Sequence, residues 1–416
     1  EIMPSLVGSE MCIRDRYATD SEAYDEVISH GGYFITHAYG SSGNTGAYTT
    51  TSADIDDVLY DGTMNNPGGK VTFPWSEGCT CGAEGVNSPE EATAKNVIAV
   101  GGVLHQGTPD PSDDTWSETS CSAYGTDDGR QKPDLCGPYD AVYTLASDGA
   151  YTTTFGGTSA AMPVVAGAGG IALEMFVEDF WGMNPYNDIP DSATIKALLI
   201  ANAEQYPISQ IPREGQGWGY PHIPNLVDRL QYIVDGDDAV STGEEVLYND
   251  IPSLTAYPFK VTLVWTDPPG TAAFDGDTAP DLVNDLNLKV VEKSTGNVYY
   301  GNMGLLSDIW STAGEGTNPW CGGANPDNNY DDLNNVENVF IPNPTGNYDI
   351  YVEGYNVPQG PQRFSLVVSG IAPGTARLSF DKEPAVYSYG DTIGITLVDT
   401  DLNTDQSIVD TATVHI

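Results

Sequence analysis

The segment Phe155-Gly-Gly-Thr-Ser-Ala-Ala-Met-Pro-Val-Val-Ala-Gly167 constrains the fold of this 416-residue chain more than any other. One serine follows Gly-Gly-Thr, and Ala and Gly dominate the residues after it. A helix of such small residues buries itself by lying close against a sheet. A serine at its start lies beside N–H groups without a helical acceptor, at the positive end of the helix dipole. Ser159 is therefore either an ordinary helix cap or a nucleophile with an oxyanion donor beside it.

The pattern around this segment predicts an α/β domain over residues 17–235. Val97–Gly102 is an apolar run that ends at a glycine turn, which is typical of a buried strand. Pro163–Glu178 and Ser192–Glu204 are predicted helices, the second with Asp191 or Ser192 as its cap. Strands that alternate with helices favour a parallel sheet covered by helices.

After Asp235 the pattern changes to apolar and polar residues in alternation, separated by glycine and proline turns. Residues 259–266, 286–291, 348–352 and 364–368 show it. We therefore predict an all-β sandwich over residues 236–372. Residues 373–416 have the same character but are too few for a sandwich of their own, so we expect them to be part of a third β domain.

The charge of the chain limits its partners. Asp and Glu number 59 and Lys and Arg 15, which gives a formal net charge of −44. Such a surface repels nucleic acid and anionic lipid, and it is typical of secreted or calcium-binding proteins. No apolar run approaches the roughly 18 residues of a membrane span. We expect a secreted monomer that binds neither nucleic acid nor membrane.

The cysteines and the first residues carry little information about the fold. Six cysteines are too few for a disulfide scaffold, and no metal-binding spacing accompanies Cys79 and Cys81. Cys121 and Cys136 flank a loop, and the sequence leaves their pairing open. Residues 1–16 resemble a non-native leader derived from an adaptor, with two of the few arginines, and we exclude them from fold reasoning.

Several segments in order resemble the subtilisin-like serine peptidases, or subtilases. GTSAAMPVVAG, at Gly157–Gly167, is similar to the family's serine motif GTSMA-x-P-x-VAG, with Ala160 where Met is usual. The other similar segments of this domain are Ile35–Gly40, Ser88–Gly102, Ser122–Cys136, Thr194–Ala203 and Gly215–Gly219. Further similarity lies in Val261–Gly270, Leu282–Leu288, Leu333–Glu337 and Gly360–Gly370. These segments resemble the β-sandwich that follows the catalytic domain in one bacterial branch.

This resemblance, over roughly residues 25–370, implies both a fold and an activity. The implied fold is a three-layer α/β domain with a parallel sheet, then a jelly-roll-like sandwich. The implied activity is serine endopeptidase action on polypeptides. Ser159 would be the nucleophile, and Gly157, Thr158, Tyr39 and Gly40 would contact substrate.

The other two members of the family's catalytic triad are absent from this sequence. A serine hydroxyl needs a general base and an orienting carboxylate, yet neither the D-[ST]-G nor the H-G-T-x-V-A motif occurs. His30 precedes two glycines, but the residues after them do not fit the histidine motif. We expect an N-terminally truncated fragment without triad-type activity. The alternative is a catalytically dead, subtilase-like binding or scaffold protein.

The family's oxyanion asparagine and its calcium give two further expectations. Val71–Gly78 stands where the asparagine motif belongs, while Asn44 lies too early and Asn87 too late. Asp281, Asn284 and Asp285 form an acidic loop segment that suits structural calcium. A second segment holds Asp327, Asp331 and Asp332, and the alternative for both is a solvated acidic loop.

Overall fold

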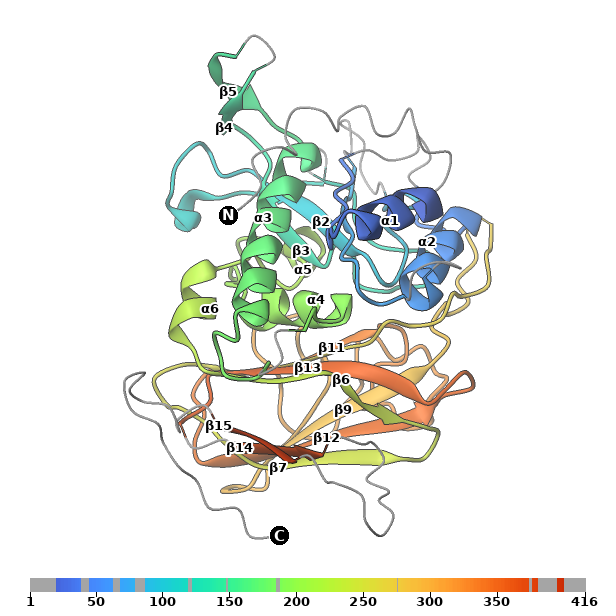
Figure 1. Ribbon diagram of the computed structural model, residues 1–416, viewed down its shortest axis with the longest axis vertical. Coiled ribbons are helices and arrows are strands. Elements are labelled where there is room, and N and C mark those ends of the chain that lie inside the picture. The colour runs from blue at the N-terminus through green and yellow to red at the C-terminus, as the bar shows by residue number, and fades with distance from the viewer. Residues whose placement is uncertain are drawn as a thin grey trace.

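The computed structural model describes residues 20–38, 45–62, 68–78, 87–118, 122–146, 149–184, 188–274 and 276–373, and two strands at 376–380 and 395–399. The chain forms an α/β domain (residues 20–230) and a two-sheet domain (residues 231–373), which lie one above the other in Figure 1.

A parallel sheet forms the centre of the α/β domain. Its strands are β1 (Pro74–Ser76), β2 (Ile98–Val103) and β3 (Leu135–Pro138), in the order β1-β2-β3. The segment through Phe34 and His37 extends the sheet by parallel bridges to Thr72 and Trp75. All six residues of β2 are buried, as expected for a strand covered on both faces. The strand predicted at 97–102 is thereby confirmed, one residue later.

Helices cover both faces of this sheet. On one face α1 (Asp20–Ser29) and α2 (Thr50–Asp61) share a core with Phe73 and Trp75. On the other, α3 (Thr158–Val177) lies across β1, β2 and β3 and contacts α4 (Ser192–Ala201). The domain also contains the short helices α5 (Arg213–Gln216) and α6 (Ile223–Asp228) and a 3₁₀ turn at Pro111–Asp113. A separate antiparallel pair, β4 (Val142–Leu145) and β5 (Tyr151–Phe155), directly precedes the turn before α3.

The serine helix begins where the serine motif indicates. α3 starts at Thr158, one residue before Ser159, includes Pro163, and ends at Val177, one residue before the predicted end. Proline lacks an N–H, so the helical bond it would donate to the carbonyl of Ser159 is missing. The helix predicted over 192–204 likewise ends earlier, at Ala201.

By length and composition alone, α3 is apolar enough to cross a membrane, contrary to the expectation that no apolar run approaches that length. Ten of its residues, among them Ala161, Val165 and Ala172, are buried within the protein. Packing against the sheet and α4 therefore explains why this helix is apolar.

Two antiparallel sheets face each other in the second domain. One has the order β11-β8-β13-β6 and the other β10-β9-β12-β7. Their bounds are β6 Gln231–Val240, β7 Glu245–Pro252, β8 Phe259–Val264, β9 Asp285–Glu292, β10 Val298–Tyr300, β11 Val336–Ile341, β12 Asn347–Asn356 and β13 Gln362–Ser369. Strands from both sheets fill one apolar core, which includes Leu263, Leu288, Val352 and Leu366. The alternating runs noted in the sequence lie on β8, β9, β12 and β13.

The two domains share buried surface. All ten residues of α4 are buried, because this helix lies between α3 and the strands β8, β13 and β6. The boundary expected at residue 235 falls inside β6, which begins at Gln231. Beyond residue 373, β14 (Ala376–Phe380) pairs with β15 (Ile395–Asp399), and a third β domain there stays a prediction.

Candidate active site

Two glycines, Gly156 and Gly157, form the turn that directly precedes α3 and Ser159. Gly157 caps the helix at φ +90° and ψ 173°, a conformation that is essentially restricted to glycine. Its N–H donates to the carbonyl of Tyr139 over 2.6 Å. A side chain at Gly156 would meet the same carbonyl at 2.7 Å. The turn therefore packs backbone against backbone, which explains why both positions are glycine.

Ser159 lies at the carboxyl edge of the parallel sheet. It is the second residue of α3, where a backbone N–H has no helical acceptor. Its side chain is partly exposed, and its hydroxyl donates to the carbonyl of Ala38 over 3.1 Å. Ala38 directly follows the bridge between His37 and Trp75, at the end of the sheet's first extended segment. Ligands of α/β proteins bind at this edge.

The remaining residues expected at the site are only partly within the described structure. Gly157 and Thr158 directly precede Ser159, and the Thr158 side chain is buried. Tyr39, Gly40 and Asn44 lie outside the described residues.

None of the described histidines is bonded to Ser159. His30 is exposed and contacts Ser29 and Glu26 of its own helix. His37 is buried and stacks on Trp75 at a centroid distance of 3.9 Å. His105 pairs with Asp140 at 2.9 Å, and His222 lies 3.9 Å from Glu204. The Ser159 hydroxyl is therefore not hydrogen-bonded to any histidine among the described residues; its bonded partner is the carbonyl of Ala38.

Val71–Gly78, which stands where the family's oxyanion asparagine motif belongs, contains β1 and, directly after it, a buried acid. Glu77 follows β1 and is fully buried. Desolvation raises its pKa to about 8, while Ser88 and the positive charge of Lys132 oppose the shift. Asn87 does not replace the asparagine, because its amide donates to the Thr45 carbonyl and to Asp127.

An apolar cavity of about 320 Å³ lies along α3, away from the serine itself. Val164 and Ile171 of the helix face Cys136, Tyr220 and Ile223 across it. Cys136 is a free, buried thiol, and burial raises its pKa, so it is poorly reactive. Cys121, the partner that the sequence left open for this residue, lies outside the described residues.

The profile of the Subtilase family matches residues 14–219. Through these residues, the chain belongs to the subtilase family. The match includes β1, β2, β3, α3 and Ser159, so the serine motif lies in the context that the resemblance implied.

Curated relatives of this subtilase are serine protease/ABC transporter B family proteins of Dictyostelium discoideum. The tagB protein is 26% identical over 315 residues, and tagD is 27% identical over 320 residues. Each alignment covers 59% of this chain and 16% of the relative. The chain thus spans about a sixth of the length of the curated relatives it matches.

Solved structures similar to the subtilase chain include the prenylagaramide maturation protease PagA, with 19% identity and a TM-score of 0.37. That match covers 50% of this chain and 65% of PagA. The patellamide maturation protease PatA is 18% identical with a TM-score of 0.35, over 50% of this chain and 66% of PatA.

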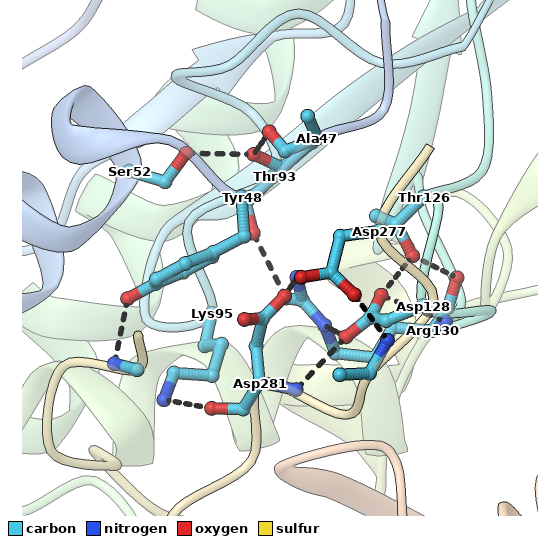
Figure 2. A network of polar contacts seen from close by, with 12 residues as sticks. Ala47, Tyr48, Ser52, Thr93, Lys95, Thr126, Asp128, Arg130, Asp277 and Asp281 are labelled. Carbon is cyan, nitrogen blue, oxygen red and sulfur yellow. Dashed lines mark hydrogen bonds and ion pairs between the residues drawn. The ribbon is translucent and has the colours of Figure 1, made fainter. Parts of the chain in front are cut away.

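Many motif residues of this subtilase hold its two domains together. Lys95 is fully buried and donates to Asp267 Oδ2 at 2.5 Å and to the carbonyls of Pro268 and Asp281. Arg130 pairs with Asp128 at 2.6 Å and lies 3.5 Å from Asp281 across the interface. Figure 2 shows Lys95, Arg130, Asp128 and Asp281 beside Tyr48. Residues of the polar motifs that precede the serine in the sequence thus form part of the contact between the two domains.

Two of the three calcium ligands expected from the sequence, Asp281 and Asn284, have protein partners. Asp281 faces Arg130, and the Asn284 amide is engaged by Gln359 and Gln362. Among the residues that the structure describes, no three Asp, Glu, His or Cys side chains are grouped as ligands of one metal ion. The sequence could not show this, because loop residues adjacent along the chain point to different partners.

Proposed function

We propose that this chain carries the nucleophile of a serine endopeptidase, with Ser159 attacking the carbonyl of a polypeptide substrate. One observation supports this most: a partly exposed hydroxyl at the second residue of a helix, at the carboxyl edge of a parallel sheet. There the N–H of Ser159 is free of helical bonds and can stabilise an oxyanion. Gly157 and Thr158, with Tyr39 and Gly40, would line the substrate.

The general base and its orienting carboxylate would come from residues that this sequence does not contain. The family membership and the missing histidine and aspartate motifs support this part of the proposal. We further propose a secreted monomer with a jelly-roll-like second domain and structural calcium, in line with a net charge of −44.

The test compares this chain with a longer product of the same gene that includes the two motifs. Hydrolysis of a chromogenic peptide should be at background for the present chain. The longer product should hydrolyse it, and Ser159→Ala should reduce its kcat by about 10³-fold or more. Ser159-dependent turnover by the present chain alone would refute the proposal that the general base and its orienting carboxylate lie outside this sequence.

A second candidate is a catalytically dead, subtilase-like binding protein. The bond from the Ser159 hydroxyl to a backbone carbonyl, and the buried Glu77 at the end of β1, favour it. Activity that is absent from a longer product with intact aspartate and histidine motifs would decide for this candidate.

A further inference from the structure

A second cavity, of about 180 Å³, lies where β2 and β3 end, at the carboxyl edge of the parallel sheet. The last residue of each strand forms part of its wall, and prolines and tyrosine rings form most of the rest. Three polar side chains join this apolar lining. The lining residues used below are His105, Pro109, Pro111, Asp114, Tyr206 and Tyr220. Apolar walls with a few polar groups are typical of a site for a small ligand.

The other acids of this region have partners within the protein. Asp113 accepts the Thr108 hydroxyl at 2.9 Å, and Asp110 accepts a backbone N–H two residues further on. Asp140 accepts the backbone N–H of His105 at 2.6 Å and lies 2.9 Å from Nδ1 of the same residue. These carboxylates therefore hold the loop between β2 and β3 in place.

Asp114 is the exception, because one of its oxygens has no partner. The residue is only 6% exposed. Its Oδ2 accepts the hydroxyl of Tyr206, whereas its Oδ1 finds no hydrogen-bond donor among the described residues. Desolvation raises the pKa of this carboxyl, and the bond from Tyr206 opposes the shift. A buried acceptor without a donor is unfavourable, so the position suits a ligand that supplies one.

The charges around the cavity favour a cation as that ligand. Residues 103–118 and 136–155 supply most of the lining and contain neither Lys nor Arg. The first of these segments contains three Asp and one Glu. His105 is the nearest basic side chain, and it already pairs with Asp140. The rings of Tyr206 and Tyr220, whose centroids are 5.0 Å apart, add faces that attract positive charge.

We propose that this cavity binds a primary ammonium group on an alkyl chain, as in the side chain of lysine. The alkyl chain would contact Pro109, Pro111 and the tyrosine rings, and the ammonium would donate to Asp114 Oδ1. A guanidinium group binds best to two parallel oxygens, but Tyr206 occupies one of the two here. The site therefore favours lysine over arginine. It does not involve Ser159, so its failure would leave the proposed function unaffected.

The test is an NMR titration of the full chain in about 0.15 M salt, which screens the long-range attraction of a cation to the acidic surface. The probes are n-butylammonium, its neutral analogue 1-butanol, and the Nα-acetyl amides of lysine and arginine. Butylammonium should bind at one site, at least about tenfold more tightly than butanol, because it makes a charged hydrogen bond. The lysine amide should likewise bind more tightly than the arginine amide. Binding of butylammonium without the lysine amide would support the same chemistry with a free amine as the ligand.

Asp114→Asn keeps an acceptor for Tyr206 and should weaken butylammonium binding by at least about tenfold. Asp113→Asn is the matched control: it removes the same charge from the exposed neighbouring residue and should change the Kd by less than about twofold. The Tm of each variant shows that it folds, and the wild-type comparison with butanol does not depend on either variant.

Three results would overturn the site. Butanol could bind as tightly as butylammonium, which would make the cavity merely apolar. Both substitutions could weaken binding equally, which would indicate general attraction to an acidic surface. The wild-type chain could bind neither amine, in which case Asp114 is held by a proton alone.

Discussion

Single residues set the geometry of the serine, and Gly157 is the clearest case. Its backbone conformation, at φ +90° and ψ 173°, is closed to residues with a Cβ. The sequence showed that glycine permits a close approach here, but not that the approach is to the carbonyl of Tyr139.

Gly157→Ala should destabilise the chain by about 1–3 kcal/mol, because the left-handed backbone becomes strained. Urea denaturation measures the effect. Gly167→Ala, in the same helix with open space around its Cβ, should instead stabilise by about 0.5–1 kcal/mol. Equal effects of the two substitutions would show that the turn does not depend on glycine.

Asp235 gives a residue-scale prediction with a pH dependence. Desolvation and the charge of Asp191 raise its pKa from 3.8 to about 6. The folded state then holds a proton that the unfolded state has lost, so stability falls as pH rises from about 4 to 6. Asp235→Asn keeps the acceptor for Thr194 and should be more stable by about 1–3 kcal/mol above pH 6.

This gain should vanish below pH 4, which chemical denaturation across the pH range will measure. The exposed Asp237→Asn on the same strand should change stability by less than about 0.5 kcal/mol at every pH. If Asp235→Asn gave the same gain in stability at pH 4 and pH 8, the effect would not come from the raised pKa of Asp235.

Among the elements, α4 departs most from its sequence pattern. The sequence predicts a helix there, and the helix forms, but the pattern does not reveal that all ten residues are buried. A lysine such as Lys196 is expected on the exposed side of a helix. In this structure its side chain is buried and pairs with Asp134 at 2.8 Å. Burial on every side arises only because the second domain covers the helix, and no local pattern contains that information.

For the whole molecule, the junction of the two domains is the main structural result. The change from an α/β pattern to an all-β pattern predicted that strands alternate with helices first and that only strands follow, as the order of the elements shows. It could not predict that Lys95 pairs with Asp267, since these residues are 172 positions apart. The serine was predictable from its motif, whereas the complete burial of Glu337 depends on packing between strands.

Lys95→Met should destabilise the chain by about 3–5 kcal/mol, because it leaves Asp267 buried without its cation. Equilibrium urea unfolding provides the measurement. Lys293→Met, which removes a largely exposed pair with Asp250, should cost at most about 1 kcal/mol. If both variants lost a similar free energy of unfolding, the buried Lys95–Asp267 pair would contribute no more to stability than an exposed pair.

The most direct test of the central claim is peptide hydrolysis by a longer gene product that supplies the aspartate and histidine motifs, measured with and without Ser159→Ala. Turnover should fall to background when the hydroxyl at position 159 is removed. Turnover that survives the substitution would contradict the assignment of Ser159 as the nucleophile.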